Sequence, residues 1–149
     1  MSKTLEVAIF LSLNGSAQDA INFYKKHFSA KELLVVTYED SVKLGIPLEI
    51  TDETKNYISH SVLEIGKTKV MIAEDTMDLN EKYMIGNNTS LCIQSADLLE
   101  IEGFYNNLIT DKRVKIITPL ESNIFSKAYG VIEDPFGIKI QLMFDDRLK

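Results

Sequence analysis

The sequence predicts an α+β protein in which the order strand, helix, strand, strand, strand occurs twice. Apolar, β-branched runs between turn residues indicate strands over 6–13, 31–38, 60–65 and 68–73, then over 89–94, 114–120, 127–133 and 139–144. A segment with apolar residues at helical spacing follows the first strand of each set. Both helical segments carry a Phe-Tyr pair, Phe23-Tyr24 and Phe104-Tyr105. An unduplicated α+β domain with coincidental pairs is the alternative.

The first helix is predicted between a turn at Asn14-Gly15 and a C-terminal end near His27. Ser16 stands at its N-terminus, with Asp19 three residues later, where the acid of a capping box would lie. We expect His27 to be partly exposed. The predicted buried face consists of Ala17, Ala20, Ile21, Tyr24 and Phe28.

The second helix is predicted to begin after Asp97, whose side chain can cap it, with Glu100 at the third helical position. Leu98, Ile101, Tyr105 and Leu108 form its apolar face. Residues 39–56 are expected to be irregular, and residues 74–87 form a polar linker. We interpret residues 134–137 as a tight turn, because proline and glycine both favour turn geometry there.

The chain is expected to be a single domain over residues 1–149. Within it, the first strand-helix-strand-strand-strand module covers 5–75 and the second covers 88–145. A chain of this length buries enough apolar surface to fold without a disulfide or a structural metal.

Charge and composition exclude several classes of partner. The formal net charge is −6, and an acidic chain repels phosphate backbones, so no nucleic-acid partner is expected. The apolar run from Val7 to Leu11 is too short to span a bilayer, and no signal-peptide pattern is present, so no membrane partner is expected. The single cysteine, Cys92, rules out an internal disulfide and fits a cytoplasmic protein.

Few residues carry an obvious chemical signal. No glycine-rich nucleotide motif and no serine-nucleophile elbow occurs. Cys92 lies in the middle of a predicted strand, where it is expected to act as a small buried hydrophobe. His60 begins a predicted strand, and either lines a cavity or is a hydrogen-bonded structural residue. Methionine and aromatic side chains on the strands either pack the core or form an adaptable cavity wall; they are Phe10, Met71, Tyr129, Phe136 and Met143.

Three stretches resemble glyoxalase/bleomycin-resistance (vicinal oxygen chelate) proteins, and most closely their PhnB-like, 3-demethylubiquinone methyltransferase-like branch. Residues 11–28 are similar to the first strand and helix of that branch, residues 60–66 to its third strand, and residues 129–142 to its last hairpin. The resemblance implies two βαβββ modules whose strands form an open, cup-shaped mixed sheet, in a protein that is commonly a homodimer. Whether the modules pair within one chain or between two stays open.

The metal-dependent members of that family use histidine, glutamine and glutamate ligands on the strands. At the corresponding positions this chain has Val7 to Leu11 in the first strand, Asn88 to Ser90 in the second module, and Gln141 in the last strand. Glu74 stands one step beyond another ligand position. A hard divalent ion needs more charged or imidazole ligands than these, so no metal and no other cofactor is expected.

Two functional hypotheses follow from the resemblance. The first is metal-independent binding of a small-molecule ligand in the cup, by Phe10, His60, Met71, Tyr129 and Gln141. The second is a lyase or isomerase acting on a small oxygenated metabolite, with His60 as base and Gln141 orienting the substrate. A role in protein interaction is a third reading, in which side chains would close the cup.

Overall fold

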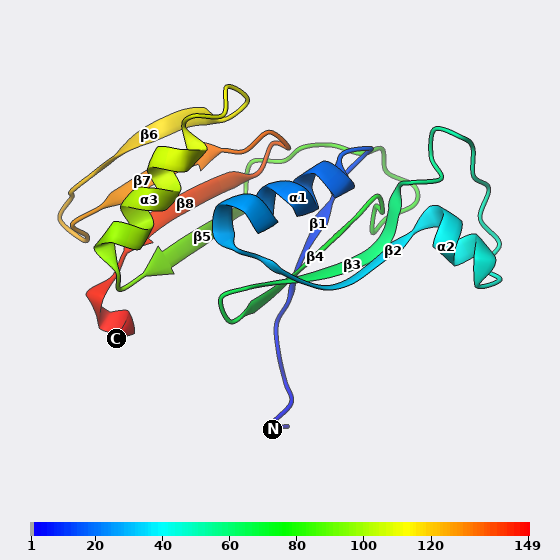
Figure 1. The fold of residues 1–149 in the computed structure, drawn as a ribbon, viewed down its shortest axis with the longest axis horizontal. Helices are drawn as coiled ribbons and strands as arrows, with labels where there is room; N and C mark the ends of the chain where they lie inside the picture. The colour runs from blue at the N-terminus through cyan, green and yellow to red at the C-terminus, as the bar shows by residue number, and fades with distance from the viewer. Residues whose placement is uncertain (1) are drawn as a thin grey trace. The chain divides into compact units, whose positions relative to one another are not determined.

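The structure, a computed structural model, describes residues 2–149 and divides the chain into two compact units (Figure 1). Unit 1 is Met1–Tyr83 and unit 2 is Met84–Lys149. Unit 1 contains β1 (Ile9–Ser12), α1 (Ala17–Phe28), β2 (Lys31–Thr37), α2 (Tyr38–Lys43), β3 (Ile58–Ile65) and β4 (Thr68–Ala73). Unit 2 contains β5 (Ser90–Ser95), α3 (Leu98–Leu108), β6 (Lys115–Glu121), β7 (Tyr129–Glu133), β8 (Lys139–Phe144) and a 3₁₀ turn, η1 (Asp146–Leu148).

Each unit forms one four-stranded mixed sheet with the same topology. The strand order is β1-β4-β3-β2 in unit 1 and β5-β8-β7-β6 in unit 2. The first strand pairs with the fourth in parallel in each sheet, and the remaining neighbours are antiparallel. The predicted fold class, an α+β protein of two βαβββ modules, is therefore confirmed.

The core of unit 1 lies between α1 and one face of its sheet (Figure 1). The helix contacts β3 and β4, and its Ile21 and Tyr24 side chains are fully buried. Leu63 on β3 and Ile72 on β4 are fully buried as well. Because successive strand residues point to opposite faces, the residues between these remain on the face without the helix.

Unit 2 repeats this arrangement with α3 on one face of its sheet (Figure 1). The helix contacts β5 and β8, and Ile101 and Leu108 are its fully buried residues. Beneath it, Ile132, Ile140 and Leu142 are fully buried. Hydrophobic packing on one side thus determines which side chains of β5, β7 and β8 remain on the helix-free face.

Most predicted elements are confirmed, with local differences. The first strand is shorter than expected, because only Ile9–Ser12 pairs with β4. A short helix, α2, lies in the segment expected to be irregular. Thr37 and Asp40 form a reciprocal capping box at its N-terminus. The helix was not predicted because the segment contains many charged residues and Gly45.

The N-terminus of α1 is capped differently from the prediction. Ser16 makes no side-chain cap, and Asp19 does not close a capping box. Glu74, which follows β4, caps the helix instead: its Oε1 accepts hydrogen bonds from the backbone N–H groups of Gly15 (3.2 Å) and Ala17 (2.7 Å). The acceptor comes from a distant part of the chain, so no local sequence pattern predicts this cap.

The C-terminus of α1 lies where it was predicted, but the exposure of His27 differs from the expectation. The helix ends at Phe28, next to His27, and Ser29 follows it in the left-handed conformation with φ 54°. His27 is buried, not partly exposed, and the centroids of the His27 and Phe23 rings lie 4.4 Å apart. The predicted apolar face of α1 is confirmed, since all five of its residues are buried.

Two local predictions in unit 2 are confirmed. The Asp97 side chain accepts hydrogen bonds from the N–H groups of Leu99 and Glu100, and so caps α3. At residues 134–137, Asp134 Oδ1 accepts from Phe136 and Ile138, and Gly137 has φ 85°, which glycine adopts without strain. Within residues 2–149, no helix is both long enough and apolar enough to cross a membrane.

We expect Glu74→Ala to lower the free energy of unfolding by about 3 kcal/mol, because three backbone N–H groups lose a charged acceptor. Urea denaturation monitored by circular dichroism measures the change. The matched control is Glu81→Ala, an exposed glutamate of the same unit, which should shift the stability by less than about 0.5 kcal/mol. Equal effects of the two substitutions would contradict this role of Glu74.

Candidate functional site

The five predicted binding residues are divided between the two units and share one structural property. Phe10, His60 and Met71 lie in unit 1, whereas Tyr129 and Gln141 lie in unit 2. Each is part-exposed and belongs to a strand. Each has at least one buried neighbour along its strand, so all five lie on the helix-free faces of the sheets.

On the helix-free face of unit 1, an apolar row crosses the sheet. Phe10 of β1 pairs with Met71 of β4, which pairs with Val62 of β3, which in turn pairs with Leu34 of β2. Side chains of paired residues point to the same face, so these four are lateral neighbours. The part-exposed side chains of Phe10, Met71 and Val62 and the exposed Leu34 form an apolar strip on which a ligand can pack.

His60 lies on the same face, two residues before Val62 on β3. It pairs with Val36 of the edge strand β2. Its neighbour Ser59 donates a hydrogen bond to the carbonyl of Val36 and contacts the hydroxyl of Ser41 at 2.6 Å. These contacts attach β3 to β2 and α2, and so fix the backbone from which His60 projects.

The helix-free face of unit 2 carries a hydrogen-bonded cluster that we call the polar triad: Ser90 of β5, Gln141 of β8 and Tyr129 of β7. The Tyr129 hydroxyl donates to Gln141 Oε1 at 2.7 Å, and Gln141 Nε2 donates to Ser90 Oγ at 2.8 Å. Tyr129 and Gln141 were predicted as site residues; Ser90 was noted only as a position without a metal ligand. Its role follows from the diagonal contact between β5 and β8, which sequence does not reveal.

An ion pair lies beside the polar triad on the same face. Lys139 pairs with Ser90 across β5 and β8, and with Glu133 across β7 and β8. Lys139 Nζ lies 3.7 Å from Glu133 Oε1, and both side chains are about one-third exposed. Their charges offset each other, so the triad has neutral surroundings on this side.

Cys92 lies on the same face and pairs directly with Gln141. It is exposed, so the prediction of a buried hydrophobe is wrong. The alternation of β5 places Leu91, its neighbour, under the helix instead. Neighbouring atoms of the sheet still desolvate the sulphur, and this raises the pKa of the Cys92 thiol above its usual value.

The buried carboxylate of Glu74 is committed to the backbone of unit 1. Besides capping α1, its Oε2 accepts a 2.6 Å hydrogen bond from the N–H of Ile58, the first residue of β3. The Tyr38 hydroxyl donates to the Glu74 carbonyl at 2.6 Å. Burial and the nearby Glu74 charge raise the pKa of Tyr38. Glu74 is thus a structural residue joining α1, β3 and β4.

The residues within each unit do not fit a divalent metal ion. Across residues 2–149, no group of three or more His, Cys, Asp and Glu side chains is gathered closely enough to hold one. Gln141 and Ser90, at two positions where family resemblance would place ligands, bind each other. A hard cation requires several carboxylate or imidazole ligands, and an amide with a hydroxyl supplies neither.

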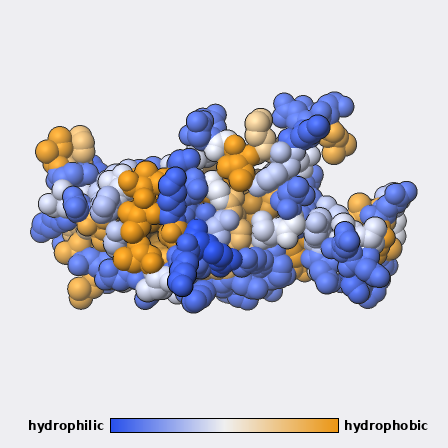
Figure 2. All heavy atoms as spheres, turned by 90° about the horizontal axis from the view of Figure 1, so that it is seen from above, coloured by the Kyte–Doolittle hydropathy of each residue, from blue (hydrophilic) through white to orange (hydrophobic). Residues whose placement is uncertain are grey.

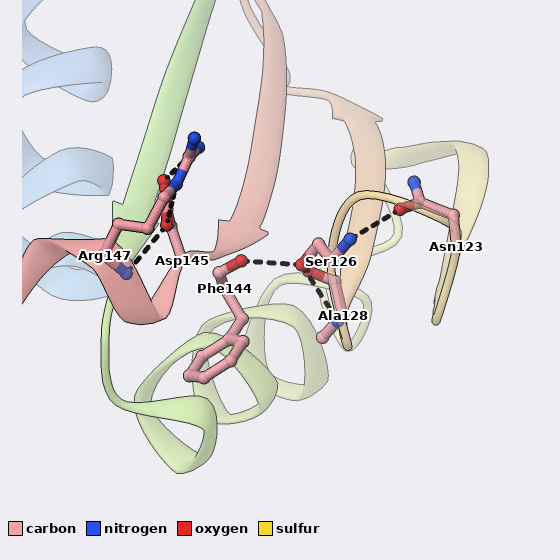
Figure 3. A network of polar contacts seen from close by, with 6 residues as sticks. All are labelled: Asn123, Ser126, Ala128, Phe144, Asp145 and Arg147. Carbon is pink, nitrogen blue, oxygen red and sulfur yellow. Dashed lines mark hydrogen bonds and ion pairs between the residues drawn. The ribbon is translucent and has the colours of Figure 1, made fainter.

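A surface pocket of about 550 Å³ lies elsewhere on unit 2, between residues 122–127 and 144–147. Its walls are tied together (Figure 3): Asn123 accepts from Ser126 N–H, the Ser126 hydroxyl lies 2.6 Å from the Phe144 carbonyl, and Arg147 forms an ion pair with Asp145 at 2.9 Å. None of the five predicted residues lines it. Of its charged residues, Arg147 and Asp145 pair with each other, and Lys127 Nζ lies 6.0 Å from the centroid of the Phe144 ring.

Part of the surface is apolar. Figure 2 shows separate hydrophobic patches on a largely hydrophilic face. Among the large apolar side chains, Ile124 and Phe125 beside the surface pocket are 91% and 85% exposed, and Leu79 is 89% exposed. Exposed apolar side chains of this size favour association with another surface.

Duplicated βαβββ units with an open, part-apolar sheet face define a class of small-molecule-binding and metal-chelating folds. Residues 9–142 match the Glyoxalase/Bleomycin resistance protein/Dioxygenase superfamily. The match covers most of the chain, so this protein belongs to that superfamily. In a search of curated proteins, no sequence matches.

Solved structures share the fold at low sequence identity. A protein of Pseudomonas aeruginosa superposes with a TM-score of 0.77 at 20% identity, covering 95% of this chain and 98% of that one. The PhnB protein of Bacillus cereus gives 0.68 at 21%, covering 95% and 100%. The fosfomycin resistance protein FosX of Listeria monocytogenes, solved with Mn(II) and sulfate, gives 0.62 at 14%, covering 97% and 91%. PhnB-like proteins are thus among the structural neighbours.

We expect Cys92 to react with iodoacetamide more slowly than N-acetylcysteine does at pH 8. The thiolate is the nucleophile, and a raised thiol pKa means that less thiolate is present at a given pH. The reaction rate should therefore keep rising above the pH at which that of N-acetylcysteine levels off. Mass spectrometry of the alkylated protein against time gives the rates. A rate at pH 8 equal to or above that of the free thiol would contradict the desolvated setting of Cys92.

Proposed function

We propose that this protein is a PhnB-like member of its superfamily that binds a small molecule without a metal, on the helix-free faces of its two sheets. The observation that carries this proposal is the common position of Phe10, His60, Met71, Tyr129 and Gln141. All five are part-exposed on those faces, while the opposite faces form the cores. Apolar side chains with a few fixed polar groups are typical of small-molecule sites.

The absence of a suitable ligand set supports metal-independent binding. The polar triad replaces charged ligands by an amide and two hydroxyls that bind one another. Of the two carboxylates on neighbouring strands, Glu133 pairs with Lys139, and Glu121 pairs with Tyr129 across β6 and β7. The cluster therefore provides directional hydrogen bonds rather than a charged chelate.

We propose further that the protein is a cytoplasmic homodimer. The exposed Ile124, Phe125 and Leu79 side chains favour contact with a second copy, because such surface is costly to leave in water. The single exposed cysteine suits a reducing compartment. The alternative is a lyase or isomerase acting on a small oxygenated metabolite, with His60 of unit 1 as base and Gln141 of unit 2 orienting the substrate.

Native mass spectrometry of the freshly purified protein tests the proposal. We expect a dimer that holds no divalent ion and carries an added small mass. After addition of Mn(II), no stoichiometric uptake should occur, because residues 2–149 gather no group of three or more His, Cys, Asp and Glu side chains that could hold the ion. One tightly held divalent ion per chain would overturn the metal-independent proposal.

The residues are tested by substitution. His60→Ala and Gln141→Leu should each reduce the fraction of protein that carries the added mass, because both remove a polar contact from the proposed face. Glu81→Ala, an exposed change away from these faces, is the control. Unchanged occupancy in both His60→Ala and Gln141→Leu would show that the ligand binds elsewhere.

A further inference from the structure

The polar triad crosses three adjacent strands of unit 2. Gln141 on the central strand β8 pairs with Cys92 of β5 and with Val131 of β7. Ser90 and Tyr129 each lie two residues before those partners, so both are diagonal neighbours of Gln141 on the same face. The two hydroxyls thus lie on opposite sides of one amide, at 2.8 Å and 2.7 Å from it.

In the arrangement that the structure shows, two donors of the triad remain unused by it. The Tyr129 O–H is committed to Gln141 Oε1, and one N–H of the Gln141 amide is committed to Ser90 Oγ. A hydroxyl has one hydrogen and an amide nitrogen has two. The Ser90 O–H and the second amide N–H are therefore left to donate to another molecule.

Rotation of the Gln141 amide by half a turn preserves both contacts. The amide nitrogen then donates to the Tyr129 oxygen, and the Ser90 hydroxyl donates to the amide oxygen. The heavy-atom positions are the same in both arrangements, since the amide O and N are nearly equal in size. Now the Tyr129 O–H is the unused hydroxyl donor, again together with one amide N–H.

The triad therefore always presents one hydroxyl donor and one amide donor, and the amide orientation selects which hydroxyl it is. Its members are uncharged, the neighbouring Lys139 is offset by Glu133, and Glu121, which pairs with Tyr129, adds a negative charge that disfavours an anionic ligand group. Ser90 is exposed and the other two are part-exposed, so a ligand can reach them. Such a donor set complements an uncharged oxygen acceptor.

We propose that the polar triad recognises the carbonyl oxygen of an uncharged ligand group, such as a ketone or amide, and that reorientation of Gln141 lets either Ser90 or Tyr129 supply the hydroxyl donor. This rests on the proposed function, because it assigns the recognised chemical group within the same binding face. It adds a specificity rule: carbonyl compounds bind at the triad, and compounds that offer only donors do not.

Two soluble probes with the same ring test the rule. Acetophenone offers a carbonyl acceptor and no donor, whereas benzylamine, which is protonated to a cation at neutral pH, offers donors and no acceptor. Each is titrated into the ¹⁵N-labelled protein in a buffer with EDTA, and the side-chain N–H₂ signals of Gln141 are followed by NMR. Acetophenone should shift these signals saturably, and benzylamine should not.

Gln141→Glu is the most informative variant, because it changes hydrogen-bonding capacity with almost no change in shape. A carboxylate only accepts, so both the Ser90 and Tyr129 hydroxyls would donate to it and no donor would remain. Acetophenone binding, followed through the backbone N–H signals of Cys92 and Val131, should weaken by about tenfold or more. Circular dichroism checks that the variant stays folded.

The hydroxyls are tested singly and together. Ser90→Ala and Tyr129→Phe should each weaken acetophenone binding by less than about twofold, because the amide turns toward the remaining hydroxyl. The double variant should weaken it by about fivefold, more than the product of the single effects. Thr118→Val removes a hydroxyl from the same face without touching the triad and is the matched control.

Three outcomes would overturn the inference: no shift of the Gln141 signals by acetophenone, an equal response to benzylamine, or one single variant as weak as the double. The proposed function fails separately. If acetophenone or benzylamine shifts signals of Phe10, His60 or Met71 but leaves Gln141 unchanged, the faces bind small molecules and only the carbonyl rule is wrong. If neither probe shifts any residue of the helix-free faces, both proposals are wrong.

Discussion

The buried carboxylate of Glu74 is the constraint on which the architecture of unit 1 depends. Its two oxygens accept hydrogen bonds from the turn before α1 and from the first residue of β3, while its backbone N–H donates to the Ile58 carbonyl. Gly15, in that turn, has φ 96°, and a Cβ there would lie 3.2 Å from the Tyr57 hydroxyl. A buried charge is costly unless it is fully hydrogen-bonded, so these donors must converge on Glu74. These hydrogen bonds fix the position of α1 over β3 and β4.

Once the helix covers one face of the sheet, strand alternation decides the chemistry of the other. Leu63 and Ile72 are fully buried beneath α1, and their neighbours along the strands face away from it. The open face of unit 1 is mainly apolar, with His60 near its edge. The open face of unit 2 is mixed, with Tyr129 and Gln141 joined by a hydrogen bond. Core packing and the helix-free face therefore use alternate residues of the same strands.

The neutral character of the open face in unit 2 has a physical basis. A carboxylate at position 141 would be stabilised by a metal ion or a cation, whereas glutamine satisfies both of its polar atoms with Tyr129 and Ser90. Lys139 and Glu133 on the same face form their own pair, and Glu121 pairs with Tyr129 across β6 and β7. The Mn(II)-bound FosX structure shares the fold at 14% identity, and a shared fold does not by itself determine the side chains of a site. Side chains on a common sheet, rather than the sheet itself, decide what is bound.

The sequence by itself determined the order of the elements, because alternation in strands, helical spacing and turn residues are local properties of the chain. It identified the Asp97 cap and the turn at residues 134–137 for the same reason. Only the tertiary structure decided that Glu74 caps α1, that Ser90 contacts Gln141, and that Cys92 is exposed. The two contacts join residues far apart in the chain. The Ser90–Gln141 contact and the exposure of Cys92 also depend on strand register, because a shift of one residue exchanges the two faces of a strand.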